Sequence, residues 1–196
     1  MNTNYRSLPH ALLEPGTSIS QSQHPEIDAI TLADKAELVL TDFAYIRPFT
    51  ISSTAPIDQI NDKMIACGVR LLFITRADGV LYGLVTFTDL FGEKPVRYIQ
   101  QHGGSREKIL AQDIMTPLAQ LEALPKNKVA RASVGDIVET IKATGRQHML
   151  VSHTHADGGQ VVSGLFSSTH IEKLLGIEIE LSPRAQTFAD LERALS

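Results

Sequence analysis

One short segment occurs twice in the chain, and this repetition restricts the possible folds more than any other feature of the sequence. The first copy spans residues 83–90, and the second, imperfect copy spans residues 164–171. In each copy a glycine and a short apolar stretch lead to a hydroxyl residue, and the residues that follow favour a helix. Because an internal repeat indicates a repeated structural unit, we predict a strand that turns directly into a helix at both places.

Thr86 and Asp89 in the first copy allow two interpretations. Their spacing is that of a capping box, in which the threonine hydroxyl and the carboxylate each accept a hydrogen bond from the other's backbone. The same residues could instead bind a ligand, because a helix N-terminus favours a phosphate and a carboxylate accepts hydrogen bonds from a sugar diol. A single turn would favour the cap, and its repetition shifts the balance towards a binding site.

The composition indicates a globular chain with no bias towards nucleic acid. Of the 196 residues 43% are hydrophobic, which suits one domain or two small domains packed together. The 18 basic and 22 acidic residues give a formal net charge of −4, so no nucleic-acid partner is expected. The single cysteine, Cys67, excludes an intrachain disulfide and a cysteine zinc cage, and we expect it to be buried in a helix.

The sequence also bears on location and catalysis. No apolar run approaches the roughly 18 residues of a membrane span, and the first residues lack the apolar core of a signal peptide. Together with the lone cysteine, this predicts a cytoplasmic protein with no membrane partner. No spacing of an esterase elbow, a phosphate-binding loop or a zinc protease is found, so we expect no enzyme.

The pattern of apolar and turn residues divides the chain into five parts. Residues 1–40 form a loose lead-in, residues 41–95 the first repeat, and residues 96–111 connecting helices. The second repeat covers residues 112–176, and a strand with an amphipathic helix follows over residues 177–196. The two repeats thus account for most of the apolar periodicity in the chain.

The predicted elements follow one order in both repeats: strand, helix, buried strand, hairpin, returning strand and closing helix. Glycine at a helix C-terminus adopts the left-handed conformation that ends the helix, and we expect Gly68, Gly145 and Gly176 to do so. The predicted ranges in the first repeat are 49–51, 57–67, 69–75, 80–85 and 86–91. Those in the second are 133–144, 148–152, 161–166 and 167–175, with a turn at 156–159 and an opening strand at either 121–124 or 129–131.

Helical spacing also predicts which side chains face the core. In the first helix the apolar residues with this spacing are Ile57, Ile60, Met64 and Ile65. In the second repeat Ser133 and Asp136 have the spacing of another capping box, at the start of a helix.

Two tandem units of this kind resemble a pair of CBS domains, also called a Bateman module. The resemblance is carried by the Gly-hydrophobic-hydrophobic-Thr/Ser motif, with the turn at Asp78 and Gly79 before its first copy, and covers roughly residues 41–176. It implies an α/β (α+β) fold of two β-α-β-β-α repeats that pack about a pseudo-twofold axis. It also implies two clefts, which in this family commonly hold adenosine-containing ligands.

The resemblance further implies which residues bind the ligand. In the family the motif threonine contacts phosphate and the motif aspartate holds the ribose hydroxyls, which correspond here to Thr86 and Asp89. The segments that would line the adenine contribute Ile51, Ser52, Val69, Arg70 and Leu71.

The second copy departs from the family pattern. Ser167 keeps the hydroxyl, but His170 stands at the aspartate position and cannot accept two diol hydrogen bonds as a carboxylate does. We therefore expect one competent site around Asp89 and a degenerate second site with Ser167, His170 and Arg146. Arg70 and Arg146, which follow helix-ending glycines, could reach a phosphate or could neutralise helix C-termini.

Other charged and metal-ligating residues are interpreted as surface features. His148, His153 and His155 are close in sequence but do not share one strand face, so no metal site is expected. Four cations near the connecting helices are interpreted as surface charge, although a polyphosphate could use them: Lys94, Arg97, Arg106 and Lys108.

The sequence therefore predicts a regulatory module that binds an adenosine nucleotide, with AMP, ADP or ATP as the leading ligands and S-adenosylmethionine or NAD as further possibilities. The resemblance implies a homodimer, and an unknown protein effector would receive the signal. The alternative is a structural, partner-binding dimer without a nucleotide, in which Thr86 and Asp89 form only a cap.

Overall fold

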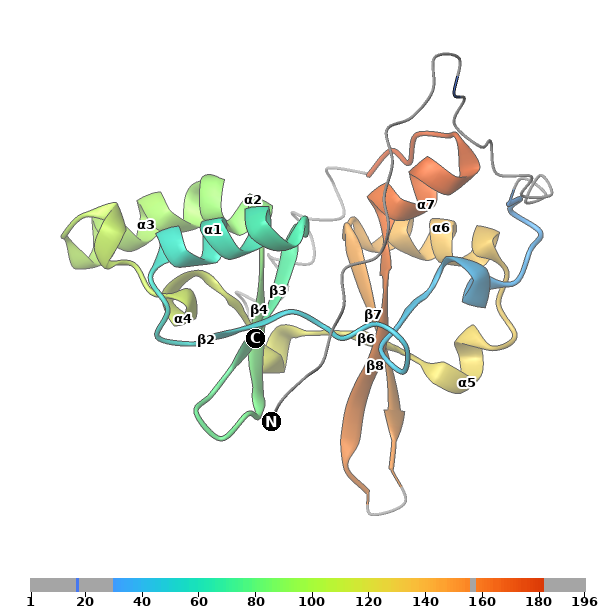
Figure 1. Ribbon diagram of the computed structural model, residues 1–196, viewed down its shortest axis with the longest axis horizontal. Helices are drawn as coiled ribbons and strands as arrows, with labels where there is room; N and C mark the ends of the chain where they lie inside the picture. Colours follow the sequence, from blue (N-terminus) through green and yellow to red (C-terminus); the bar gives the residue numbers. More distant parts are fainter. Residues whose placement is uncertain (1–16, 18–29, 156–157, 182–196) are drawn as a thin grey trace.

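Two α/β units lie side by side and form the protein (Figure 1). The computed structural model describes residues 17, 30–155 and 158–181. The elements of the first half are η1 Ala36–Val39, β1 Thr41–Asp42, β2 Thr50–Ser52, α1 Ile57–Cys67, β3 Leu71–Thr75, β4 Leu81–Thr86, α2 Phe87–Phe91, α3 Glu93–His102, η2 Arg106–Lys108 and α4 Ala111–Ile114. Those of the second half are β5 Thr116–Pro117, η3 Leu118–Gln120, β6 Ala123–Pro125, α5 Lys126–Val129, α6 Val134–Thr144, β7 His148–Thr154, β8 Gln160–Ser167 and α7 Ser168–Leu175.

The first helix of each repeat has the boundaries that its sequence predicts. Helix α1 ends at Gly68 and α6 ends at Gly145, and both glycines adopt the left-handed conformation, with φ of 65° and 64°. Helix α6 begins at the predicted capping box, in which the Ser133 hydroxyl and the Asp136 backbone are 3.2 Å apart. The C-terminal ends are satisfied locally, because the backbone N–H groups of Gly68 and Gly145 bond to carbonyl groups in the last turn of their own helix. The first N–H groups of the two helices bond elsewhere in the chain, Ile57 to Ile109 and Val134 to Asp34.

Each repeat contributes three strands to a four-stranded sheet. One sheet has the order β2-β3-β4-β5 and the other β1-β8-β7-β6. In both sheets a parallel pair, β2 with β3 or β6 with β7, is followed by an antiparallel hairpin. Residues 71–74 of β3 are all buried, which confirms the prediction of a strand covered on both faces.

The fourth strand of each sheet comes from outside that repeat. Strand β1 comes just before β2 in the chain but pairs with β8 of the second repeat, and β5 comes just before β6 but pairs with β4 of the first repeat. Thr41–Asp42 therefore lies in the sheet of the second repeat, although the sequence assigned residues 41–95 to the first. The pairing ties the two repeats together through their sheet edges.

Glycine at the start of both repeated motifs permits this exchange. A Cβ atom on Gly83 would lie 2.5 Å from the backbone oxygen of Thr116, and one on Gly164 would lie 2.9 Å from that of Thr41. The motif glycines are thus required by the close approach of a neighbouring backbone.

Among the described residues, three buried clusters form the core. One lies under the helices of each repeat, around Ile60 in the first and Ile141 in the second. The third joins the facing sheets through Leu71, Phe73, Leu84 and Leu150, which come from both repeats. Because these side chains pack in one layer, the two sheets face each other as the resemblance implied.

Several predicted details differ from the structure. Ile65 is 70% exposed because it points away from the α1 face that holds Ile60 and Met64, and Cys67 is half-buried and not in the core. The connecting helix begins at Glu93 and not at residue 96, because Pro95 is accommodated in its first turn. The opening strand of the second repeat is β6, and Val129 instead lies in the short helix α5.

The C-terminal prediction is also wrong where the structure describes it. Residues 177–181 form no strand, and they are held instead by the buried side chain of Ile179 and by a hydrogen bond from its backbone N–H to Glu172. The helix expected over 183–195, most of the lead-in and part of the turn at 156–159 lie outside the described residues.

The replacement Gly83→Ala tests the close approach of β5. We expect a loss of about 1–3 kcal/mol in the free energy of unfolding, because the new methyl group forces the paired backbones apart. Urea denaturation followed by circular dichroism measures it, with Ala119→Gly in the exposed part of η3 as a control. A stability equal to that of the wild type would contradict the account of the motif glycine.

Candidate functional site

A cleft of about 360 Å³ opens where the two repeats meet. One wall carries Thr86, Asp89 and Lys94 from the end of β4 and the helices that follow it. The opposite wall carries Arg146 and His148, which follow the C-terminus of α6 and begin β7. The cleft therefore brings together residues from both repeats that are distant in the sequence.

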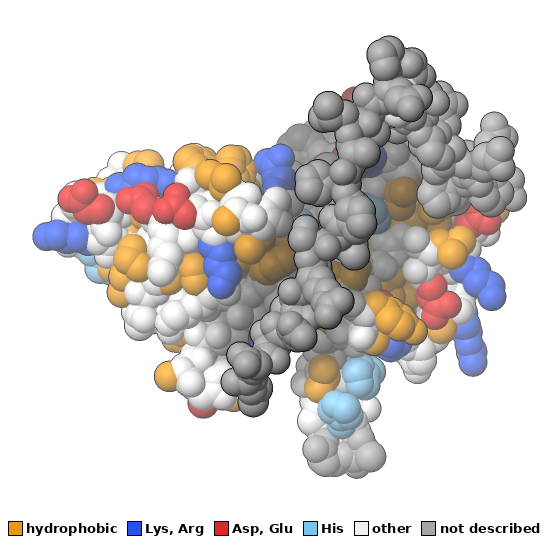
Figure 2. All heavy atoms as spheres, in the orientation of Figure 1, with side chains coloured by type: hydrophobic (Ala, Val, Ile, Leu, Met, Phe, Trp, Pro, Cys, Tyr) orange, Lys and Arg blue, Asp and Glu red, His pale blue; other side chains and the backbone are white. Residues whose placement is uncertain are grey.

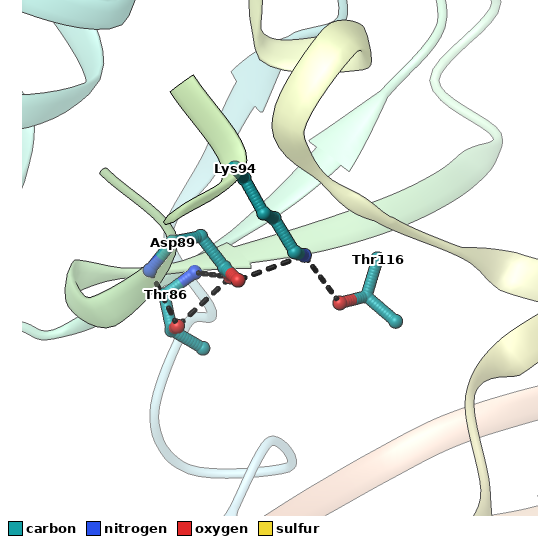
Figure 3. A network of polar contacts seen from close by, with 4 residues as sticks. All are labelled: Thr86, Asp89, Lys94 and Thr116. Carbon is teal, nitrogen blue, oxygen red and sulfur yellow. Dashed lines mark hydrogen bonds and ion pairs between the residues drawn. The ribbon is translucent and has the colours of Figure 1, made fainter. Parts of the chain in front are cut away.

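Thr86 and Asp89 form the predicted capping box at the start of α2 (Figure 3). Asp89 Oδ2 accepts hydrogen bonds from the backbone N–H of Thr86 at 2.7 Å and from its hydroxyl at 2.8 Å. The Asp89 backbone N–H lies 3.4 Å from Thr86 Oγ1. The cap and the cleft thus use the same two residues, so the two sequence interpretations of this turn are compatible.

Lys94 approaches the same carboxylate from α3 (Figure 3). Its Nζ lies 2.8 Å from Asp89 Oδ1 and donates a hydrogen bond to Thr116 Oγ1 at 3.2 Å. The Asp89 side chain is 14% exposed and that of Lys94 40%, so the ion pair lies at the mouth of the cleft.

The interpretation of Lys94 as surface charge is therefore wrong. Gly92 is a brief break between α2 and α3, and the turn at this residue brings the first residues of α3 back to Asp89. The signal that could have found Lys94 is its position in the first turn of a helix that starts directly after the motif helix.

The structure places Arg146 in a different site from the one that the sequence predicted. The sequence grouped it with the degenerate second site, yet it lines the cleft of Thr86 and Asp89, 3.3 Å from Glu122 Oε2. The reason is the face-to-face packing of the sheets, which places the start of β7 opposite the end of β4. Ser167 and His170 do not line this cleft, Ser167 makes no side-chain cap, and His170 is exposed on α7.

The five residues expected to line the adenine are not among those that line the cleft. Ile51 and Leu71 are buried in hydrophobic clusters, and Val69 packs against the core of the first repeat. Ser52 is exposed and bonds to Thr54, and the Arg70 guanidinium lies 4.8 Å from the centre of the Phe87 ring. Four of these side chains are thus engaged in core packing or at neighbouring positions of the same repeat, whereas the charge of Arg70 also acts on His148 of the second repeat.

His148, which lines the cleft, has a strongly lowered pKa. Desolvation, together with the nearby positive charge of Arg70, lowers the pKa of His148 from 6.5 to about 4, and Asp89 opposes the change only in part. The imidazole is therefore neutral at neutral pH, when it can both donate and accept a hydrogen bond. From the sequence, His148 was predicted to begin a buried strand and was weighed as a metal ligand, with no expectation that it would line the cleft.

The three histidines of β7 and its hairpin, His148, His153 and His155, do not come together in the structure. The rings of His153 and His155 lie 5.1 Å apart near the tip of the β7–β8 hairpin, where Figure 2 shows histidine side chains, while His148 lies at the other end of β7. Within the ranges that the structure describes, no group of three or more metal-ligating side chains is found. In the same ranges no helix has the length and apolarity needed to cross a membrane.

Comparison with solved structures identifies the fold. An uncharacterized conserved protein from Pyrococcus horikoshii aligns with a TM-score of 0.53 and 15% identity, over 78% of this chain and 100% of the other. CBSX2, solved in complex with AMP, aligns with a TM-score of 0.50 and 15% identity, over 71% and 94%. The CBS domain protein TA0289 of Thermoplasma acidophilum, of unknown function, gives a TM-score of 0.50 and 12% identity, over 82% and 76%.

No family model and no curated protein matches the sequence. The fold is nevertheless that of a CBS-domain pair, with two tandem α/β repeats, as the repeated motif predicted.

The replacement His148→Leu tests the desolvated imidazole. Leu71 occupies the equivalent position of the first repeat, where it pairs with Thr86 as His148 pairs with Ser167. Because the unfolded chain binds a proton below pH 6.5 and the folded chain only near pH 4, wild-type stability falls as pH drops between these values.

At about 1.4 kcal/mol per pKa unit, the free energy of unfolding of the wild type falls by about 3 kcal/mol by pH 4 through this group. This loss is absent in His148→Leu. Urea denaturation of both proteins between pH 7 and 4 measures the difference. Parallel pH profiles would contradict a neutral, desolvated His148.

Proposed function

We propose that the cleft binds an adenosine nucleotide and that the chain is a regulatory module with no catalytic step. One observation carries the proposal: the hydroxyl and carboxylate of Thr86 and Asp89 share a cleft with two cations, Lys94 and Arg146, between the two repeats. The complex of CBSX2 with AMP, a protein of similar fold, supports this class of ligand. AMP, ADP and ATP are the leading candidates, and S-adenosylmethionine and NAD are further ones.

The chemistry of the cleft suits the parts of such a ligand. A carboxylate accepts hydrogen bonds from the ribose diol, and the lysine and arginine can balance the charge of a phosphate. Apolar contact for a base is available from Leu84 and Leu150, and a volume of about 360 Å³ lies within the range of small-molecule sites. Here the phosphate is assigned to the cations, because α2 has only 5 residues.

The second motif is proposed to be a degenerate site. Ser167 and His170 lack the carboxylate that would hold a diol, and Arg146, which would have supplied charge there, faces the first cleft. We therefore propose that each chain has one cleft that can bind the ligand.

A ligand in this cleft would contact both repeats at once. Binding would therefore favour one arrangement of the repeats over others, and the signal is a shift in their populations. We propose that a cytoplasmic homodimer carries the signal to a protein effector.

The alternative function is structural, with the CBS fold retained for assembly with a partner. Ser133 and Asp136 favour it, because they form the same capping box as Thr86 and Asp89 at a place outside the cleft. A capping box by itself is therefore no sign of a ligand, and the two pairs provide a matched comparison.

The replacement Asp89→Ala tests the proposal, with Asp136→Ala as the matched control. Both variants lose the carboxylate of a capping box and are expected to be less stable, by about 1 kcal/mol for Asp89→Ala. Only Asp89→Ala is expected to lose the rise in melting temperature that AMP, ADP or ATP produces in the wild type.

A thermal-shift titration measures both effects, with GMP and GTP as controls for base selectivity and S-adenosylmethionine and NAD in the same screen. Equal nucleotide shifts in the wild type and Asp89→Ala would contradict the role of Asp89. No shift with any adenosine compound would favour the structural alternative.

A further inference from the structure

We propose that Lys94 occupies the Asp89 carboxylate until the phosphate of the ligand draws the ammonium away, so that the cleft accepts nucleotides and discriminates against nucleosides. This inference rests on the proposed function and deepens it, because it assigns the selectivity of the same site to one side chain. The number of hydrogen bonds that Asp89 can still accept decides whether a diol can bind there (Figure 3).

Asp89 has little free capacity in this structure. A carboxylate offers about four acceptor positions, two on each oxygen. The Thr86 backbone and hydroxyl fill those of Oδ2, at 2.7 and 2.8 Å, and Lys94 fills one on Oδ1 at 2.8 Å. One position is left, whereas a ribose diol donates two hydrogen bonds. A nucleoside can therefore gain the second bond only if Lys94 moves away.

Moving Lys94 has a cost that depends on the ligand. The Asp89 side chain is mostly buried. If the Lys94 ammonium moves away and no other cation replaces it, the buried carboxylate loses its counter-charge, which is unfavourable. A phosphate offers the ammonium a new anion, and the diol then takes the position on Oδ1. Adenosine brings the diol but no anion, so it has to break the ion pair without compensation.

The surroundings of Lys94 allow this exchange. Its side chain is 40% exposed and carries the charge on a flexible stem, so the ammonium can turn towards the cleft. Thr116, which accepts its second hydrogen bond, lies on the strand that leads to the second repeat. Arg146 is held similarly by Glu122 across the cleft, so both cations are paired with an acid of this chain.

The ratio of AMP to adenosine affinity tests this inference. Isothermal titration calorimetry at one low salt concentration is applied to the wild type and to Lys94→Met, which keeps the apolar stem and removes the charge. We expect the variant to bind AMP more weakly and adenosine more tightly, so that the ratio falls by about tenfold or more.

Three further variants separate the explanations. Lys94→Gln is a second neutral replacement, for use if Lys94→Met does not fold. Lys94→Arg keeps the charge and is expected to keep a preference for AMP. Lys128→Met removes an exposed lysine of α5 outside the cleft and is expected to leave both affinities unchanged.

The outcomes distinguish this inference from the function on which it rests. If the wild type and the neutral variants bind AMP and adenosine with the same ratio, Lys94 does not control selectivity, while the nucleotide site itself stands. A fall in AMP affinity without a gain in adenosine affinity would also overturn the inference. Lys94 would then only contact the phosphate and would not restrict access to Asp89. If the wild type binds neither AMP nor adenosine, the inference fails, and the proposed function fails with it if no other adenosine compound of the thermal-shift screen binds either.

Discussion

The pairing of each sheet with a strand from outside its repeat is the constraint on which the rest of the structure depends. Strands β1 and β5 reach their partners only because Gly83 and Gly164 have no side chain in the way. The exchange fixes the two sheets relative to each other, and the apolar layer between them then excludes water. A glycine that begins a recognisable motif thus has an architectural role, separate from that of the polar residues behind it.

The cleft is a consequence of this packing. Because the sheets face each other, the end of β4 and the start of β7 meet, and the polar residues at both places line one space. Its charges are arranged in pairs, Lys94 with Asp89 and Arg146 with Glu122. A ligand that carries both a diol and an anion can exchange these internal partners for its own groups, whereas a ligand with only one of them leaves a charge poorly compensated.

In the proposed function, binding in this cleft is coupled to the arrangement of the repeats, because the cleft is lined by both of them. The Lys94 ammonium also donates a hydrogen bond to Thr116, which lies on β5 just before the chain enters the second repeat. Neutral His148 on the opposite wall adds a group that neither repels nor attracts a phosphate strongly. The proposed selectivity and the proposed signalling therefore use the same few contacts.

The sequence by itself determined the local features of this protein. The repeated strand-to-helix turn, the capping boxes of Thr86 and Ser133, and the helix ends at Gly68 and Gly145 could be predicted, because each is satisfied by residues close together in the chain. Only the tertiary structure decided that β1 and β5 exchange sheets, that Arg146 joins Asp89 and that Lys94 pairs with it. These contacts depend on how the sheets face each other and on the turn at Gly92, which the spacing of residues along the chain does not encode.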